Sequence, residues 1–147
     1  MIDTDFLRPM RGRFRLLVWR HGRIIGRMND DNLVVDLAKT GITRLLGGDT
    51  TNRPITKFAV GTNGTAPAAG DTTITNVFVK AVDGVSYPTA SSVRFAFSLT
   101  DAEANGLAIL EFGLLTAGNV LYARKVRASA LNKAADITIS GTWTLSF

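Results

Sequence analysis

Residues 137–147 alternate between apolar and hydroxyl-bearing side chains, with one glycine in the apolar row. The apolar row consists of Ile137, Ile139, Gly141, Trp143, Leu145 and Phe147, and the hydroxyl row consists of Thr138, Ser140, Thr142, Thr144 and Ser146. Successive side chains of a strand point to opposite faces, so this pattern predicts a strand with one buried face. Burial of five apolar side chains at about 1.5–3 kcal/mol each would make this strand a major part of the core. The same pattern predicts that Phe147 is buried and that C-terminal truncation is poorly tolerated.

Similar apolar patterns recur upstream, separated by residues that favour turns. They predict strands over residues 55–60, 73–82, 93–99, 108–115 and 120–127. Two further apolar stretches, 14–19 and 24–28, flank Arg20-His21-Gly22-Arg23 and predict a β-hairpin with His21 at its tip. Short strands joined by short turns predict a mainly β fold, an antiparallel β-sandwich with an N-terminal hairpin arm.

One short helix is expected near residues 37–46, because Ala38, Ile42 and Leu45 recur at helical spacing. Asp36 is a plausible N-cap, and Gly47-Gly48 would end the helix. A single helical turn is also expected over residues 101–106. The predicted organisation is a basic arm and hairpin over residues 1–30 and a β-sandwich domain over residues 31–147.

Positive charge is concentrated in the first 30 residues. Seven arginines against three aspartates give this segment +4, while ten lysines and arginines against nine acids give the rest +1. The predicted partner interface comprises Arg8, Arg11, Arg13, Arg15, Trp19, Arg20, Arg23 and Arg27. Its arginines could pair with carboxylates of a protein partner, contact phosphates, or only solvate the hairpin. Trp19 could anchor an interface or pack on its own domain.

Residue types suited to catalysis or metal binding are sparse. The chain has no cysteine and one histidine, so we expect no catalytic, metal or cofactor site. Glu111 in an apolar strand could be a catalytic acid, but pairing with Arg124 is favoured. Asp101 and Glu103 fit a helix start better than acid–base chemistry. The loop that begins at Gly61 lacks the lysine of a phosphate-binding loop and is interpreted as a turn.

Four segments carry a family resemblance. They are NLVVDLAKTGITRLLGG at 32–48, ITKFAVGTNGTAPAAGDTTITN at 55–76, LAILEFGLLTAGNVLYARKV at 107–126 and LNKAADITISGTWTLSF at 131–147. Together they resemble small structural proteins of tailed bacteriophages, of the tail-fibre and baseplate-associated kind. The resemblance covers residues 32–147 with gaps and does not clearly include the arginine-rich start.

The resemblance implies a non-enzymatic virion component, most simply of the tail, at the baseplate or fibre attachment. A capsid decoration or cement protein and a receptor- or carbohydrate-binding module of the tail are the alternatives. The expected partners are other virion subunits and copies of the chain in a homo-oligomer, through added strands or arginine–carboxylate pairs. Nucleic acid is the less favoured partner. The longest apolar runs are shorter than the roughly 18 residues of a membrane span, and the N-terminus lacks a signal-peptide pattern. Synthesis in the host cytoplasm and incorporation into the virion tail are therefore expected.

Overall fold

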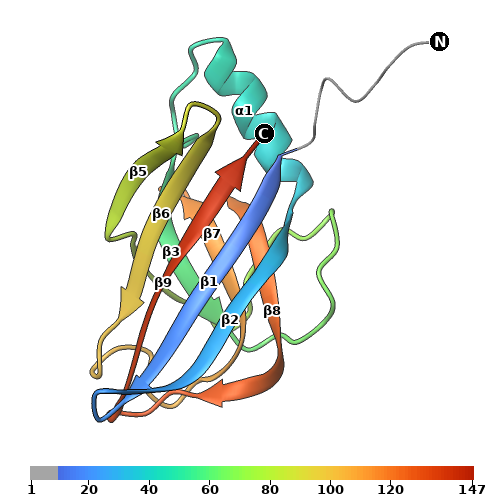
Figure 1. The fold of residues 1–147 in the computed structure, drawn as a ribbon. Helices are drawn as coiled ribbons and strands as arrows, with labels where there is room; N and C mark the ends of the chain where they lie inside the picture. The colour runs from blue at the N-terminus through green and yellow to red at the C-terminus, as the bar shows by residue number, and fades with distance from the viewer. Residues whose placement is uncertain (1–9) are drawn as a thin grey trace, which may run out of the picture.

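The computed structural model describes residues 10–147, which form nine strands and one helix (Figure 1). The strands are β1 (Arg11–Arg20), β2 (Arg23–Val34), β3 (Ile55–Gly61), β4 (Phe78–Ala81), β5 (Gly84–Thr89), β6 (Ser92–Leu99), β7 (Ala108–Thr116), β8 (Leu121–Asn132) and β9 (Ile137–Ser146), and the helix is α1 (Asp36–Leu46). None of the helical structure in residues 10–147 is long and apolar enough to cross a membrane.

All nine strands belong to one antiparallel sheet in the order β4-β3-β7-β8-β2-β1-β9-β6-β5. The sheet curls so that its two halves lie face to face, as Figure 1 shows. At one corner β2 leaves β1 and pairs with β8 through Leu33 and Val34. At the other corner residues 82–83 connect β4 to β5. The predicted mainly β fold, with antiparallel strands and one short helix, is confirmed.

The core between the two halves is aromatic. Phe14 of β1 lies 4.9 Å from Phe112 of β7, and Phe97 of β6 lies 4.1 Å from Phe58 of β3, as ring centroids. Trp143 of β9 packs against Phe14 edge-on at 4.8 Å. Because these contacts join strands from both halves of the sheet, they hold the curled sheet closed.

The alternation predicted for the last strand is confirmed up to Leu145. Ile137, Ile139, Trp143 and Leu145 are all buried. The predicted burial of Phe147 is wrong, because its side chain is 62% exposed. β9 ends at Ser146, and only the backbone N–H of Phe147 is held, by the carbonyl of Ser91 at 3.1 Å. Phe147 thus follows the strand without entering the core.

The N-terminal hairpin is an inner part of the sheet. β1 pairs with β2 on one side and with β9 on the other, and Phe14, Leu16 and Val18 are buried. The boundary expected between residues 30 and 31 falls inside β2. The hairpin turn itself lies where predicted, at His21 and Gly22, whose φ angles of 49° and 72° match the twist of a two-residue hairpin turn.

Three further local predictions differ from the structure, and one strand was not predicted. The strand expected over residues 73–82 is only Phe78–Ala81, because the preceding segment is a loop that buries Ile74. β5 was not predicted, and all six of its residues are exposed. Asp36 is not the N-cap, since that position is Val35; Asp36 lies in the first turn, where its charge favours the helix dipole. Residues 101–106 form turns and bends instead of a helical turn.

Candidate functional interface

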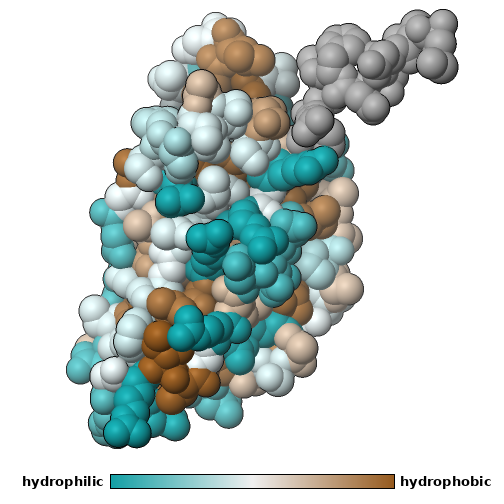
Figure 2. Space-filling model, viewed as in Figure 1, coloured by the Kyte–Doolittle hydropathy of each residue, from teal (hydrophilic) through white to brown (hydrophobic). Residues whose placement is uncertain are grey.

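The face of the sheet that points away from the core carries most of the predicted interface. On β1 the buried residues alternate with Arg11, Arg13 and Arg15, all of them exposed. We call these three residues the arginine row. The Cα atoms of neighbours on one face of a strand are about 6.6–6.8 Å apart, so three arginine side chains project from regularly spaced points of the backbone. Figure 2 shows hydrophilic residues gathered over this part of the face.

A row of hydroxyls lies beside the arginine row. Arg11, Arg13 and Arg15 stand opposite Ser146, Thr144 and Thr142 of β9. On the far side of β9, Arg94 of β6 donates from its Nε to the Thr144 hydroxyl at 3.0 Å. These short side chains lie low on the sheet, so the arginines project beyond them into solvent.

The arginine row is mostly uncompensated within residues 10–147. Arg13 pairs with Asp31 of β2 at 3.1 Å, with side chains 45% and 89% exposed. Such an exposed pair contributes little to stability, about 0–1 kcal/mol. Arg11 and Arg15 form no ion pair with residues 10–147, and Arg15 stands opposite the neutral Asn29. The face therefore keeps positive charge that a partner could neutralise.

The other predicted interface residues are divided between two places. Arg27 lies on β2 opposite Leu17, on the same face as the arginine row. Arg20 and Arg23 flank the hairpin turn, where Arg20 pairs with Asp136 at 3.0 Å. Arg8 lies outside the described residues.

Trp19 packs on its own sheet. Its side chain is half-buried, and its indole Nε1–H donates to the Ser140 hydroxyl of β9 at 3.1 Å. Nearby, Ile25 occupies an irregularity in the hairpin and is 49% exposed. The hairpin end of the face is thus less polar than the arginine row, as the hydrophobic patch low on the surface in Figure 2 also shows.

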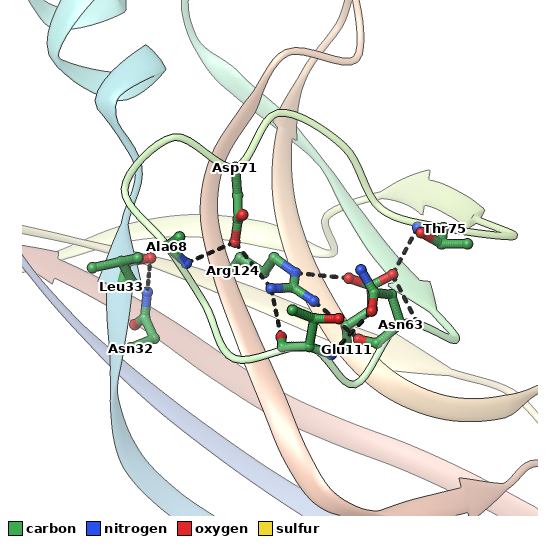
Figure 3. Close-up of polar contacts among 9 residues, drawn as sticks. Asn32, Leu33, Asn63, Ala68, Asp71, Thr75, Glu111 and Arg124 are labelled. Carbon is green, nitrogen blue, oxygen red and sulfur yellow. Dashed lines mark hydrogen bonds and ion pairs between the residues drawn. The ribbon is translucent and has the colours of Figure 1, made fainter.

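The predicted pairing of Glu111 with Arg124 is confirmed and forms part of a larger network (Figure 3). Arg124 donates from Nε to Glu111 at 2.7 Å and from Nη1 to Asp71 at 2.9 Å. Its remaining bonds go to the carbonyls of Thr65 and Asn63. The sequence alone did not reveal Asp71 or the carbonyls, because they come from a loop about 50–60 residues away.

Glu111 completes the anchoring of this loop. Its second carboxylate oxygen accepts the backbone N–H groups of Asn63 at 3.2 Å and Thr75 at 2.7 Å. Both oxygens of the buried carboxylate are therefore bonded, and the network fixes both ends of the loop between β3 and β4. This arrangement is structural, because each charged group is already satisfied by a protein partner.

Glu103 is also held in place, but not at the helix start that the sequence predicted, because residues 101–106 form turns and bends. Its carboxylate accepts a hydrogen bond from the Thr100 backbone N–H at 2.9 Å. It also forms an ion pair with Lys80 at 2.8 Å. The bond from Lys80, with the Thr100 bond, lowers the pKa of Glu103 below its ordinary value. Glu103 therefore joins the turn after β6 to β4.

We compared the chain with family models, with curated proteins and with solved structures. None of the three comparisons found a match.

Proposed function

We propose that this protein is a structural subunit of a tailed-bacteriophage virion, located in the tail at the baseplate or fibre attachment. The resemblance of residues 32–147 to small phage tail proteins supports the particle and the place. The arginine row supports the mode of action, which is contact with neighbouring subunits.

The observation that carries the proposal is that the positive charge of the exposed arginine row is only partly neutralised within residues 10–147. Arg11 and Arg15 are exposed on β1, an inner strand that is paired on both sides. An inner strand fixes the backbone positions from which the arginines project, so the spacing of the row is set before a partner binds. Guanidinium groups form bidentate bonds with carboxylates, which gives both orientation and specificity. The matching surface on the neighbour is one that displays Asp or Glu side chains.

The charge of the row also restricts how copies of this chain could assemble. Two copies meeting face to face through the arginine row would bring like charges together, which is unfavourable. A homo-oligomer would therefore place the row against a different, acidic surface of another copy, either reciprocally in a two-fold dimer or head-to-tail in a ring. A neighbouring subunit with a different sequence would likewise have to present an acidic surface to the arginine row.

A charge-reversal pair tests the mode of action. Arg11→Glu/Arg15→Glu leaves the Arg13–Asp31 pair in place and changes the net charge by −4. Lys39→Glu/Arg44→Glu makes the same charge change on the exposed face of α1 and serves as the matched control. We expect only the first variant to be lost from particles assembled in cells that produce the virion, while both purified variants fold. Equal incorporation of the two variants would contradict the role of the row.

The place of the protein is tested separately. Particles produced by the genome that encodes this chain should contain it in stoichiometric amount by quantitative mass spectrometry. Gold-labelled antibody against the chain should bind the tail in electron micrographs. Absence from purified particles would overturn the proposal, and labelling of the head would favour the capsid decoration alternative.

A further inference from the structure

A groove of about 640 Å³ opens at the hairpin end of the outer face, away from the arginine row. The side chains that matter here are those of Trp19, His21, Asp101, Asp136, Thr138 and Ser140. The volume falls within the range of about 300–1,000 Å³ that is usual for small-molecule sites. Residues within 19–22 and 135–140, together with Asp101, line the groove, so only the folded chain brings these side chains together.

The strand order explains the layout of the groove. β9 lies between β1 and β6, and Thr138 of β9 stands opposite Trp19 of β1. Asp101 follows the end of β6 on the other side of β9. The hydroxyls of Thr138 and Ser140 thus lie between an aromatic side chain and a carboxylate. Two strand spacings, about 9.5 Å, separate β1 from β6, which is wide enough for one pyranose ring.

Trp19 is fixed within the groove. The bond from its Nε1–H to the Ser140 hydroxyl at 3.1 Å holds the indole toward β9. The side chain is half-buried and lines the groove, so it keeps some apolar surface open to a ligand. An immobilised aromatic ring binds an apolar partner with little loss of conformational freedom. The C–H face of a sugar ring is such a partner.

The polar groups of the groove are mainly hydrogen-bond acceptors. Asp136 is oriented by Arg20 at 3.0 Å and lies 3.9 Å from the His21 imidazole. Asp101 is exposed and makes no ion pair with residues 10–147. The two carboxylates are offset by Arg20 and by Lys133, whose charge interacts with both of them. A groove without excess charge favours a neutral ligand, and its carboxylates accept hydrogen bonds from O–H donors. Within residues 10–147 the acids and histidines form no group of three that could hold a metal ion.

We propose that this groove binds a neutral saccharide. One pyranose ring lies with its C–H face against Trp19, and its hydroxyls donate to the carboxylates of Asp101 and Asp136. Thr138 exchanges hydrogen bonds with the same ring. This proposal is independent of the subunit contacts of the arginine row, because the two sites share no residue. A shallow site for one or two sugar rings gives a dissociation constant of about 1–10 mM.

Nuclear magnetic resonance of the full ¹⁵N-labelled chain tests the proposal. The probes are glucose, galactose, mannose and N-acetylglucosamine, with the disaccharides maltose, cellobiose, lactose and chitobiose, each added to about 50 mM. The two indole N–H signals report separately, because Trp143 is buried and its Nε1–H donates to Asn32. We expect at least one probe to shift the Trp19 signal saturably and to leave the Trp143 signal in place.

Two matched variants establish that the effect arises in the groove. Asp101→Asn should weaken binding of the active probe about tenfold, because it replaces a charged acceptor. Asp83→Asn makes the same change at an exposed aspartate in the β4–β5 connection and should leave binding unchanged. The proposal is overturned if no probe shifts the Trp19 signal saturably, or if the two variants bind equally.

Discussion

The guanidinium of Arg124 and the carboxylate of Glu111 meet at 2.7 Å on adjacent strands, with their side chains only 2% and 0% exposed. The pair lies in the half of the sheet opposite the arginine row and anchors the loop between β3 and β4. Charged groups buried this completely are stable only while every partner is present.

Replacing Arg124 should therefore be costly. Arg124→Met leaves the Glu111 carboxylate buried without its cation and should lower the free energy of unfolding by about 3–5 kcal/mol. Adding Glu111→Met should cost less than the sum of the single changes, because no isolated charge remains. Urea denaturation of the two single variants and the double variant measures this coupling. Additive effects would contradict the network.

Gly141 should not tolerate a side chain. A Cβ at this position would collide with the backbone carbonyl of Arg15 and approach the Phe97 ring to 2.6 Å. Gly141→Ala should destabilise the protein by about 1–3 kcal/mol, because β1 or the aromatic core must shift. Gly70→Ala is the matched control, since nothing lies within 4 Å of its Cβ. Thermal unfolding of both variants distinguishes crowding from the general effect of replacing glycine.

Phe147 should be dispensable for stability, contrary to the expectation from the sequence pattern. Phe147→Ser removes a side chain that is 62% exposed and should change the free energy of unfolding by no more than about 0.5 kcal/mol. Leu145→Ala, two residues earlier on the buried face, should cost about 2–5 kcal/mol. Chemical denaturation of the two variants makes the comparison, and similar losses would show that Phe147 does contribute to packing.

Glu103 should make stability depend on pH in the acid range. Its pKa is lowered in the folded protein, so folding favours the ionised form. The resulting stabilisation is complete above the ordinary pKa of 4.5 and is lost as the pH falls through the lower, folded value. Between about pH 6 and pH 3, Glu103→Gln should show a shallower decline in the free energy of unfolding than the unchanged protein. Lys80→Met should flatten the curve only in part, because the Thr100 bond remains. An unchanged slope in Glu103→Gln would contradict this assignment.

The sequence was most informative where alternation and turn chemistry agree. Phe14, Leu16 and Val18 alternate with less buried side chains up to a two-residue turn at His21 and Gly22. The turn lies where predicted, and the strand contains the predicted residues 14–19. The pairing of Glu111 with Arg124 could also be predicted from the sequence, because the two residues lie on strands joined by a short turn.

The sequence was less informative where tertiary contacts override local preference. Ile74 suggested a strand, but it is buried by a loop whose ends are held by Glu111 and Arg124. β5 lies at the edge of the sheet with every residue exposed, so the short alternation of Val85 and Tyr87 does not mark a buried face. The groove at Trp19 could not be predicted from the sequence either, because only the strand order brings Asp101 and Asp136 near the hairpin turn.

The position of β9 has a consequence for biosynthesis. The first strand pairs with residues 137–146, and so does β6, so both wait for a segment that the ribosome makes after every other strand. Until that segment emerges, the nascent chain carries two unsatisfied strand edges and an aromatic core that lacks Trp143. The sheet can therefore close only after residues 137–146 have been synthesised.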